Sequence, residues 1–325
     1  MKSIFRPLKA LPLLGALGSL ALLTLLPEEA AAGAQQGLSI CGGVILPSLL
    51  PFLTLSNLLT ALGLPRLLAR RCAPLLGRLG IPPQAAAPLL LGLTGGYPVG
   101  AAAVAELVRS GELSSDEAAH ILPGCSNTGP AFIMGAAGAA VFGSGRIGLL
   151  LYVSHILAAL CVLLLFGRCK GSDGLREQPA ITTVGFSEAF PAAMRSAALS
   201  AVNICGYVVV FSVLTALLRA LGWFPILVSA LHDGSGMELQ SANALLTGLL
   251  ELGSGIAAMR GMPANAASVA LCAFLLGFGG LSVYCQTLGV VSNAKIKCAR
   301  QLVGRMVHGL LSALISFVLF RLLQI

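Results

Sequence analysis

Long stretches without a charged residue dominate this sequence. Such windows cover residues 10–27, 30–65, 79–105, 118–145, 147–167, 196–218, 261–294 and 306–320. A helix that crosses a bilayer needs about 20 mostly apolar residues, and most of these windows are long enough. Only 10% of the residues are charged, whereas soluble domains carry roughly 25%. The pattern predicts an all-α polytopic membrane protein and excludes an ordinary soluble enzyme.

The remaining charges and the cysteines limit the partners that this chain can have. The net charge is +8, but the basic residues lie between apolar stretches, which is how membrane proteins set their orientation. Membrane lipids are therefore expected around the chain, and nucleic acid is not an expected partner. None of the nine cysteines forms a C-x-x-C pair, so no disulfide framework, metal site or cofactor is expected.

The first window allows two interpretations. A basic start, an apolar stretch and the sequence AAAGA at residues 30–34 are typical of a secretory signal peptide. An uncleaved first helix is the preferred interpretation, because the rest of the chain is itself polytopic.

Two segments have the composition of re-entrant hairpins rather than of simple spans. In residues 85–110, Gly95, Gly96, Pro98 and Gly100 interrupt two apolar flanks of about ten residues, which are too short to cross a bilayer. Residues 242–262 repeat this pattern around the sequence ELGSG. Irregular backbone at membrane depth is tolerated only where protein or a water-filled cavity satisfies it.

Short motifs recur in the same order in the two halves of the chain. The pairs are LLTALG (58–63) with ALLRALG (216–222), GLTGGYPVGAAA (92–103) with GLLELGSGIAAM (248–259), and GCSNTGPAFIMG (124–135) with GFGGLSVYCQTLG (277–289). The pairs predict two related units, each with a long helix, a hairpin, a broken helix and a closing helix. The expected organisation is an N-terminal helix (1–37), a first unit (38–167), a cytoplasmic linker (168–196) and a second unit (197–325).

The basic residues predict how these units lie in the membrane. With re-entrant hairpins and a cytoplasmic N-terminus, seven spans place sixteen of the 20 Lys and Arg residues inside, Arg305 among them. Only Arg146, Arg219, Arg260 and Arg321 are then outside; with spanning hairpins the split is thirteen to seven. Since cytoplasmic loops carry an excess of Lys and Arg, inverted units and an external C-terminus are favoured. Inverted repeats with interrupted helices are typical of secondary transporters.

Polar residues at the hairpin tips and helix breaks are the candidate binding residues. Glu251 stands alone in an apolar segment, and a carboxylate deep in a bilayer costs at least ~2.5 kcal/mol. It must therefore face protein or water, either to bind a ligand or to cap a hairpin helix. The full set of expected cavity residues is Thr94, Tyr97, Ser126, Asn127, Glu251, Ser254, Ser282 and Gln286.

Structural roles remain open for several of these residues. Ser126, Asn127 and their counterparts Ser282 and Gln286 could serve only the backbone of the broken helices. Thr94 and Tyr97 lie at the first hairpin tip, which needs turn-forming residues whether or not it binds a ligand. His155, in the middle of an apolar helix, is expected to form a packing hydrogen bond, with proton transfer as the alternative.

Five segments carry a resemblance to a known family. They are LPSLLPFLTLSNLL (46–59), GLTGGYPVGAAAVAEL (92–107), CSNTGPAFIMG (125–135), GLLELGSGI (248–256) and GFGGLSVYCQ (277–286). They resemble the YlbJ family of sporulation integral membrane proteins, which is grouped with the nucleoside-recognition, or Gate-domain, membrane proteins. The Gate group is similar in plan to concentrative nucleoside transporters, with two inverted units that each contain a hairpin and a broken helix. The resemblance implies a bacterial inner membrane and a role in spore cortex or envelope formation.

Two functions follow as hypotheses. The first is a transporter or permease that moves a small polar solute by alternating access, with a coupling cation as a candidate second ligand. The alternative is a non-transporting assembly factor that binds envelope-building partners or a second copy of itself. The sequence contains neither G-x-x-x-x-G-K-[ST] nor H-E-x-x-H, and no enzymatic activity is expected.

Overall fold

The computed structural model describes residues 5–169 and 185–324, which contain helices and no strand. Residues 170–184 of the expected linker lie outside the described residues. The first half contains α1 (Phe5–Leu25), α2 (Pro27–Ile40), η1 (Cys41–Ile45), α3 (Leu46–Ala61), α4 (Leu64–Arg78), η2 (Pro83–Ala85), α5 (Ala86–Gly95), α6 (Tyr97–Arg109), α7 (Ser115–Cys125), η3 (Phe132–Ala139) and α8 (Gly145–Phe166). The second half contains α9 (Phe186–Ala220), α10 (Trp223–Ser235), α11 (Leu239–Leu250), α12 (Leu252–Ala258), α13 (Ala266–Phe278), α14 (Gly280–Val291), η4 (Ser292–Ala294) and α15 (Ala299–Leu323).

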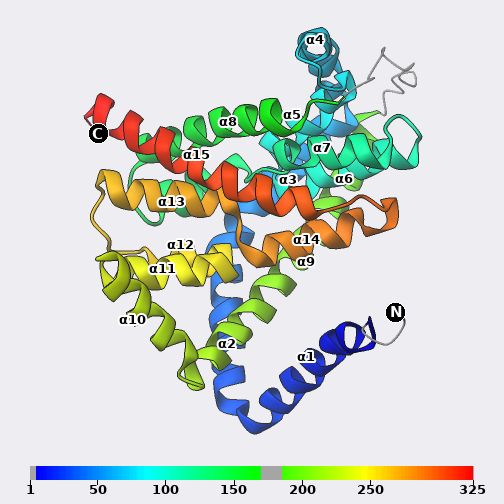
Figure 1. Ribbon diagram of the computed structural model, residues 1–325. Coiled ribbons are helices and arrows are strands. Elements are labelled where there is room, and N and C mark those ends of the chain that lie inside the picture. The colour runs from blue at the N-terminus through cyan, green and yellow to red at the C-terminus, as the bar shows by residue number, and fades with distance from the viewer. Residues whose placement is uncertain (1–4, 170–184, 325) are drawn as a thin grey trace.

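Helices α8, α13 and α15 pack side by side (Figure 1). Glycines permit the close contact between α13 and α15, because a side chain at Gly277 would collide with the backbone of Gly309. The contact between α2 and α9 is built in the same way, with Gly33 and Gly37 against the backbone of α9. Small residues at such contacts are typical of helix packing in membranes, where backbones approach closely.

Helix α1 lies apart from this bundle. It meets α2 at a bend of 101° and projects away from the other helices in Figure 1. Its leucines, such as Leu14 and Leu20, are exposed. An apolar helix with an uncovered surface is suited to lipid contact.

The two expected hairpins are both pairs of short helices that fold back on themselves. Gly96, with φ of +88°, separates α5 from α6, and the arms meet where Gly100 faces Gly92. Glu251 separates α11 from α12, and these arms meet where Gly255 faces Gly248. A side chain on either glycine pair would force the arms apart, which explains why the sequence has glycine on both sides of each tip.

The two broken helices differ in their details. The chain leaves helical geometry after α7 and resumes in a π-helical turn, η3. In the second half, the break between α13 and α14 lies at Gly279 (φ +84°) and Gly280 (φ +77°). Capping boxes begin both broken helices, Ser114 with Glu117 at α7 and Asn265 with Ser268 at α13.

Some of the expected spans are single long helices and others are divided into shorter pieces. Within the described residues, four helical segments are long and apolar enough to cross a bilayer, or five if α1 and α2 form one bent span. The four are Gly145–Phe166, Phe186–Ala220, Ala266–Ala294 and Ala299–Leu323. The segment 118–145, where a broken helix was expected, is divided between α7 and η3; each is too short to cross alone, so this segment is not among the four. The coarser prediction of an all-helical polytopic membrane protein is confirmed.

Candidate solute-binding site

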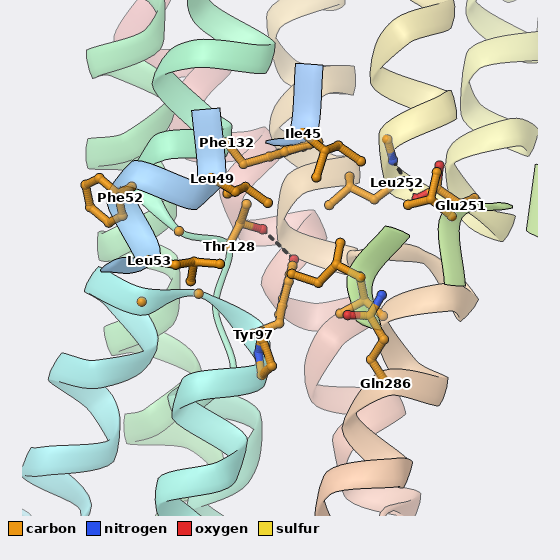
Figure 2. Close-up of a pocket in the computed structure, with 18 residues that line it drawn as sticks. Ile45, Leu49, Phe52, Leu53, Tyr97, Thr128, Phe132, Glu251, Leu252 and Gln286 are labelled. Atoms are coloured by element: carbon orange, nitrogen blue, oxygen red, sulfur yellow. Dashed lines mark hydrogen bonds between the residues drawn. The ribbon is translucent and has the colours of Figure 1, made fainter. Parts of the chain in front are cut away.

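The two hairpin tips and the two broken helices meet at one narrow, partly enclosed cavity of about 70 Å³, referred to below as the enclosed cavity (Figure 2). The polar side chains in its wall are Tyr97 from the first tip, Thr128 from the first break, Glu251 from the second tip, and Gln286 from α14. The apolar side chains of the wall come from η1, α3 and α9, and also from η3, α12 and α14. In Figure 2, Thr128 and Tyr97 lie on one side of the cavity and Glu251 on the other.

Glu251 is positioned as the N-cap of α12. Its side chain is 2% exposed, and its carboxylate oxygens accept hydrogen bonds from the backbone N–H groups of Gly253 (2.8 Å) and Ser254 (2.5 Å). The positive end of the α12 dipole stabilises the negative charge. The hydroxyl of Ser282 lies beside this carboxylate but makes no hydrogen bond of good geometry. Glu251 therefore caps a hairpin helix and also lines the cavity.

Tyr97 connects the first hairpin to both broken helices. Its hydroxyl donates a hydrogen bond to the carbonyl oxygen of Leu276 (2.5 Å), near the C-terminus of α13. The hydroxyl of Thr128 lies within hydrogen-bonding distance of both Tyr97 Oη (2.5 Å) and the Leu276 oxygen (2.7 Å). The backbone N–H of Thr128 donates to His155 Nε2 (3.0 Å). The expected packing hydrogen bond of His155 is thus present.

Other predicted residues lie behind the cavity or away from it. Ser126 and Asn127 are fully buried but do not line the cavity, and Asn127 Nδ2 donates to the carbonyl of Gly124 (2.8 Å). Thr94 is exposed, and its hydroxyl donates to the carbonyl of its own helix at Leu90. The structure therefore brings Tyr97, Glu251 and Gln286 to the cavity, together with Thr128.

Ser254 belongs to a second pocket, which lies on one side of the cavity. This pocket of about 290 Å³ also contains Gln36, Arg219 and Thr247. Arg219 donates hydrogen bonds to Asn243 (2.7 Å) and to Thr247 (3.3 Å).

A third pocket of about 350 Å³ is lined by Asn57, Ser196, Ser200 and Asn203, among others. The three pockets follow one another along α9, whose residues 196–203 line the third pocket, 204 and 208 the enclosed cavity, and 219 the second pocket. The α2–α3 segment lines the same pockets in the reverse order. Residues from 36 to 40 line the second pocket, residues from 45 to 53 line the enclosed cavity, and residue 57 lines the third pocket. The enclosed cavity therefore lies between two wider, more open polar pockets.

Arg305, which the charge count places on the cytoplasmic side, is not among the predicted site residues. It lies in α15, only 3% exposed. Its Nε donates to the carbonyl of Phe278 (3.0 Å), and Nη1 donates to the carbonyl of Ser126. The guanidinium also covers the ring of Tyr97. A basic residue at the edge of the charge-free window 306–320 resembles a loop residue. His308, Ser312 and Ser316 follow Arg305 at helical spacing, and this pattern is the signal that would have predicted a buried helix face.

Arg305 thereby caps the C-termini of α7 and α13 together. The last carbonyls of a helix carry partial negative charge, and one guanidinium has enough N–H groups to bind two such ends. Among the described residues, no group of three or more His, Cys, Asp and Glu side chains could hold a metal ion. The site is therefore built from helix ends, two oppositely charged side chains and hydroxyl groups.

Comparison with known proteins agrees with the motifs. Residues 43–178, which contain the first hairpin and the first break, match the Gate family model, described as nucleoside recognition. The chain is 26% identical to the sporulation integral membrane protein YlbJ of Bacillus subtilis (strain 168), over 91% of this chain and 78% of that protein. No solved structure gives a significant match. The family resemblance is confirmed: a segment of this integral membrane chain matches the Gate family model, and the chain is similar along most of its length to a sporulation membrane protein.

Proposed function

We propose that this protein is a secondary transporter that moves a small polar solute between the two open pockets through the enclosed cavity. The alignment of the three pockets along α9 and along α2–α3 carries the proposal. A solute that enters either open pocket meets a hairpin tip before it reaches the cavity. Movement of one tip at a time would expose the cavity alternately to the two sides.

An inverted repeat of the kind found in concentrative nucleoside transporters is part of the proposal. The order of elements supports it: α2–α3, α4, α5–α6, α7–η3 and α8 correspond in type to α9, α10, α11–α12, α13–α14 and α15. The turns that precede α4 and α10 both contain a left-handed glycine, Gly63 and Gly222. In this arrangement the N-terminus is cytoplasmic, the C-terminus is outside, and the membrane is a bacterial inner membrane.

The size of the cavity bears on the solute. Pockets for drug-sized ligands measure roughly 300–1,000 Å³, whereas this cavity measures about 70 Å³. The conformation described here is therefore closed, and a nucleoside-sized solute requires the hairpin tips to separate. A nucleoside remains the first solute to test, because the Gate family is described by nucleoside recognition. A role in spore formation is proposed from the name of the relative.

Thermal stabilisation followed by flux tests the proposal. The purified protein is heated with uridine, adenosine and a panel of amino acids and sugars, because a ligand at a hundred times its Kd stabilises a protein by about 2.7 kcal/mol. The stabilising compound is then offered in radiolabelled form to proteoliposomes. Saturable uptake supports transport. Absence of both stabilisation and uptake, with a fixed partner that co-purifies, would favour the alternative of an envelope-assembly factor.

A further inference from the structure

A continuous polar stripe runs along the buried face of α15. Its members follow one another at spacings of three or four residues, which places them on one side of the helix. They are Gln301, Arg305, His308, Ser312 and Ser316, and each is at most 3% exposed. At 1.5 Å per residue the stripe is about 22 Å long. Neither the enclosed cavity nor the two open pockets contain any of these residues.

Side chains from two other elements meet this stripe. The rings of His155 on α8 and His308 lie 4.4 Å apart, measured between centroids. Arg305 binds the carbonyl of Ser126, which places the break after α7 against the same side of α15. The stripe, the break and His155 thus enclose one buried polar region.

Several buried atoms of this region make no hydrogen bond to another described residue. They are Ser126 Oγ, Asn127 Oδ1, His155 Nδ1, Gln301 Oε1, Arg305 Nη2, His308 Nδ1 and Ser312 Oγ. A buried polar atom without a hydrogen-bond partner is destabilising. So many in one region would together remove much of the stability of a typical domain. These atoms therefore require a ligand.

The hydrogen bonds that are formed determine what that ligand must offer. His155 Nε2 accepts from Thr128, so a neutral ring carries its proton on Nδ1, which is a donor. His308 Nε2 lies 3.2 Å from the carbonyl of His155 and donates to it, which leaves Nδ1 as an acceptor. The amide oxygens of Asn127 and Gln301 are acceptors, and the two serine hydroxyls can act in either role.

Water, which both donates and accepts hydrogen bonds, suits this mixture of donors and acceptors better than a single ion. A cation would face the N–H of His155 and the positive charge of Arg305. An anion would face the lone pair of His308 and the amide oxygens of Asn127 and Gln301. Buried waters in proteins make about three hydrogen bonds each, to otherwise unsatisfied polar groups.

We propose that the stripe of α15 is a hydration site, where a row of bound water molecules bridges α15 to His155 and to the break after α7. The water lies behind the wall of the enclosed cavity, because Thr128 turns its side chain to the cavity and its backbone N–H to His155. It supplies hydrogen-bond partners to the hydroxyl of Ser126 and the amide oxygen of Asn127, which have none among the described residues.

X-ray hydroxyl-radical footprinting of the intact protein in detergent tests this inference. Radicals form from water and oxidise the side chains beside it, and mass spectrometry identifies the oxidised residues. We expect oxidation of His155 and His308 despite their burial. His232, which is exposed, is the positive control, and Met259, buried among apolar residues with 0% exposure, is the negative control. If both buried histidines are as unreactive as Met259, the site is dry and the inference is wrong.

A variant locates the water along the stripe. Ser312→Val replaces the hydroxyl with a methyl group, so it removes one water partner and fills its space. We expect oxidation of His308 to fall, while oxidation of His232 is unchanged. An unchanged rate at His308 would contradict a row of water that extends from His308 to Ser312.

Discussion

The guanidinium of Arg305 lies 4.1 Å from the centroid of the Tyr97 ring. A permanent cation on the last helix is thereby held against the tip of the first hairpin, while its N–H groups bind the ends of α7 and α13. A buried charge is tolerated only when it is paired and hydrogen-bonded. Here helix ends and an aromatic face provide that compensation, so the first hairpin, the two breaks and α15 depend on one side chain.

Replacement of Arg305 by Lys should destabilise the protein. Lysine keeps the charge, but its ammonium group cannot reproduce the planar arrangement of donors that binds Ser126 and Phe278 together. Loss of one hydrogen bond to a charged group costs about 1.5–3 kcal/mol. The free energy of unfolding in detergent, followed by circular dichroism, measures the change.

Arg300→Lys is the matched control, because Arg300 is on the same helix and is exposed. It should leave the free energy of unfolding nearly unchanged. Equal effects of the two substitutions would show that the contacts of Arg305 do not stabilise the breaks.

The hydroxyl groups of Tyr97 and Thr128 should stabilise the protein as a pair. Each contacts the other and the Leu276 carbonyl, so Tyr97→Phe and Thr128→Val should not be additive. Residues in one network commonly show coupling energies of about 0.5–3 kcal/mol. A double-mutant cycle of unfolding free energies measures this coupling. Tyr152→Phe combined with Thr128→Val is the control cycle, and additivity in both cycles would contradict the network.

Gly279→Ala should be more harmful than Gly261→Ala. Both glycines have a left-handed backbone, with φ of +84° and +82°, so both substitutions carry the strain of about 1–2 kcal/mol. A Cβ atom at Gly279 would also lie 2.6 Å from Arg305 Nη2 and 2.8 Å from Tyr97 Oη, whereas none of the described atoms lies within 4 Å of one at Gly261. The difference between the two losses in thermal stability therefore measures the contact. Equal losses would show that Arg305 and Tyr97 can move aside without cost.

The sequence was sufficient to predict the hairpins and the breaks. Gly96 and Gly279 need conformations that other residues avoid, and such positions can be recognised from composition alone. Glu251 could be recognised in the same way, since a lone carboxylate in an apolar segment requires a partner. These signals are local in the sequence, so they can be recognised without knowledge of how the helices pack.

The sequence could not predict which side of each helix faces the cavity. Thr94 is only three residues from Tyr97, but it precedes the turn at Gly96 and lies on the outer side of α5, where it bonds to Leu90. Arg305 was missed as a site residue because the start of α15 at Ala299 cannot be fixed within a basic segment. Both errors concern packing between distant segments, which a charge count does not describe.

Cysteine labelling in a cysteine-free background tests the inverted arrangement. Ser110 follows the first hairpin and Arg260 follows the second, and both are exposed. If the hairpins enter from opposite sides, Ser110→Cys should react with an impermeant maleimide only from the cytoplasm, and Arg260→Cys only from outside. Labelling of both from one side would contradict the inverted repeat, although it would leave the all-helical fold intact.

Glu251→Gln should separate the two roles of this residue. Glutamine keeps one oxygen that can accept from Gly253 or Ser254, so the cap should weaken by about 1 kcal/mol, in the range of N-cap substitutions. The negative charge at the cavity is lost, and under the proposed function we expect stabilisation by the bound solute and its uptake to be abolished. Expression and insertion should remain close to those of the unaltered protein.

Glu238→Gln provides the control for this change, since Glu238 precedes α11, is exposed and makes no side-chain cap hydrogen bond. Removal of its charge should affect neither stability nor uptake. If Glu251→Gln retains full solute binding and uptake, the carboxylate is a structural cap alone and the charge takes no part in transport. If Glu251→Gln instead fails to insert, Glu251→Asp keeps the charge on a shorter side chain. This variant distinguishes a requirement for the negative charge from a requirement for the length of the glutamate side chain.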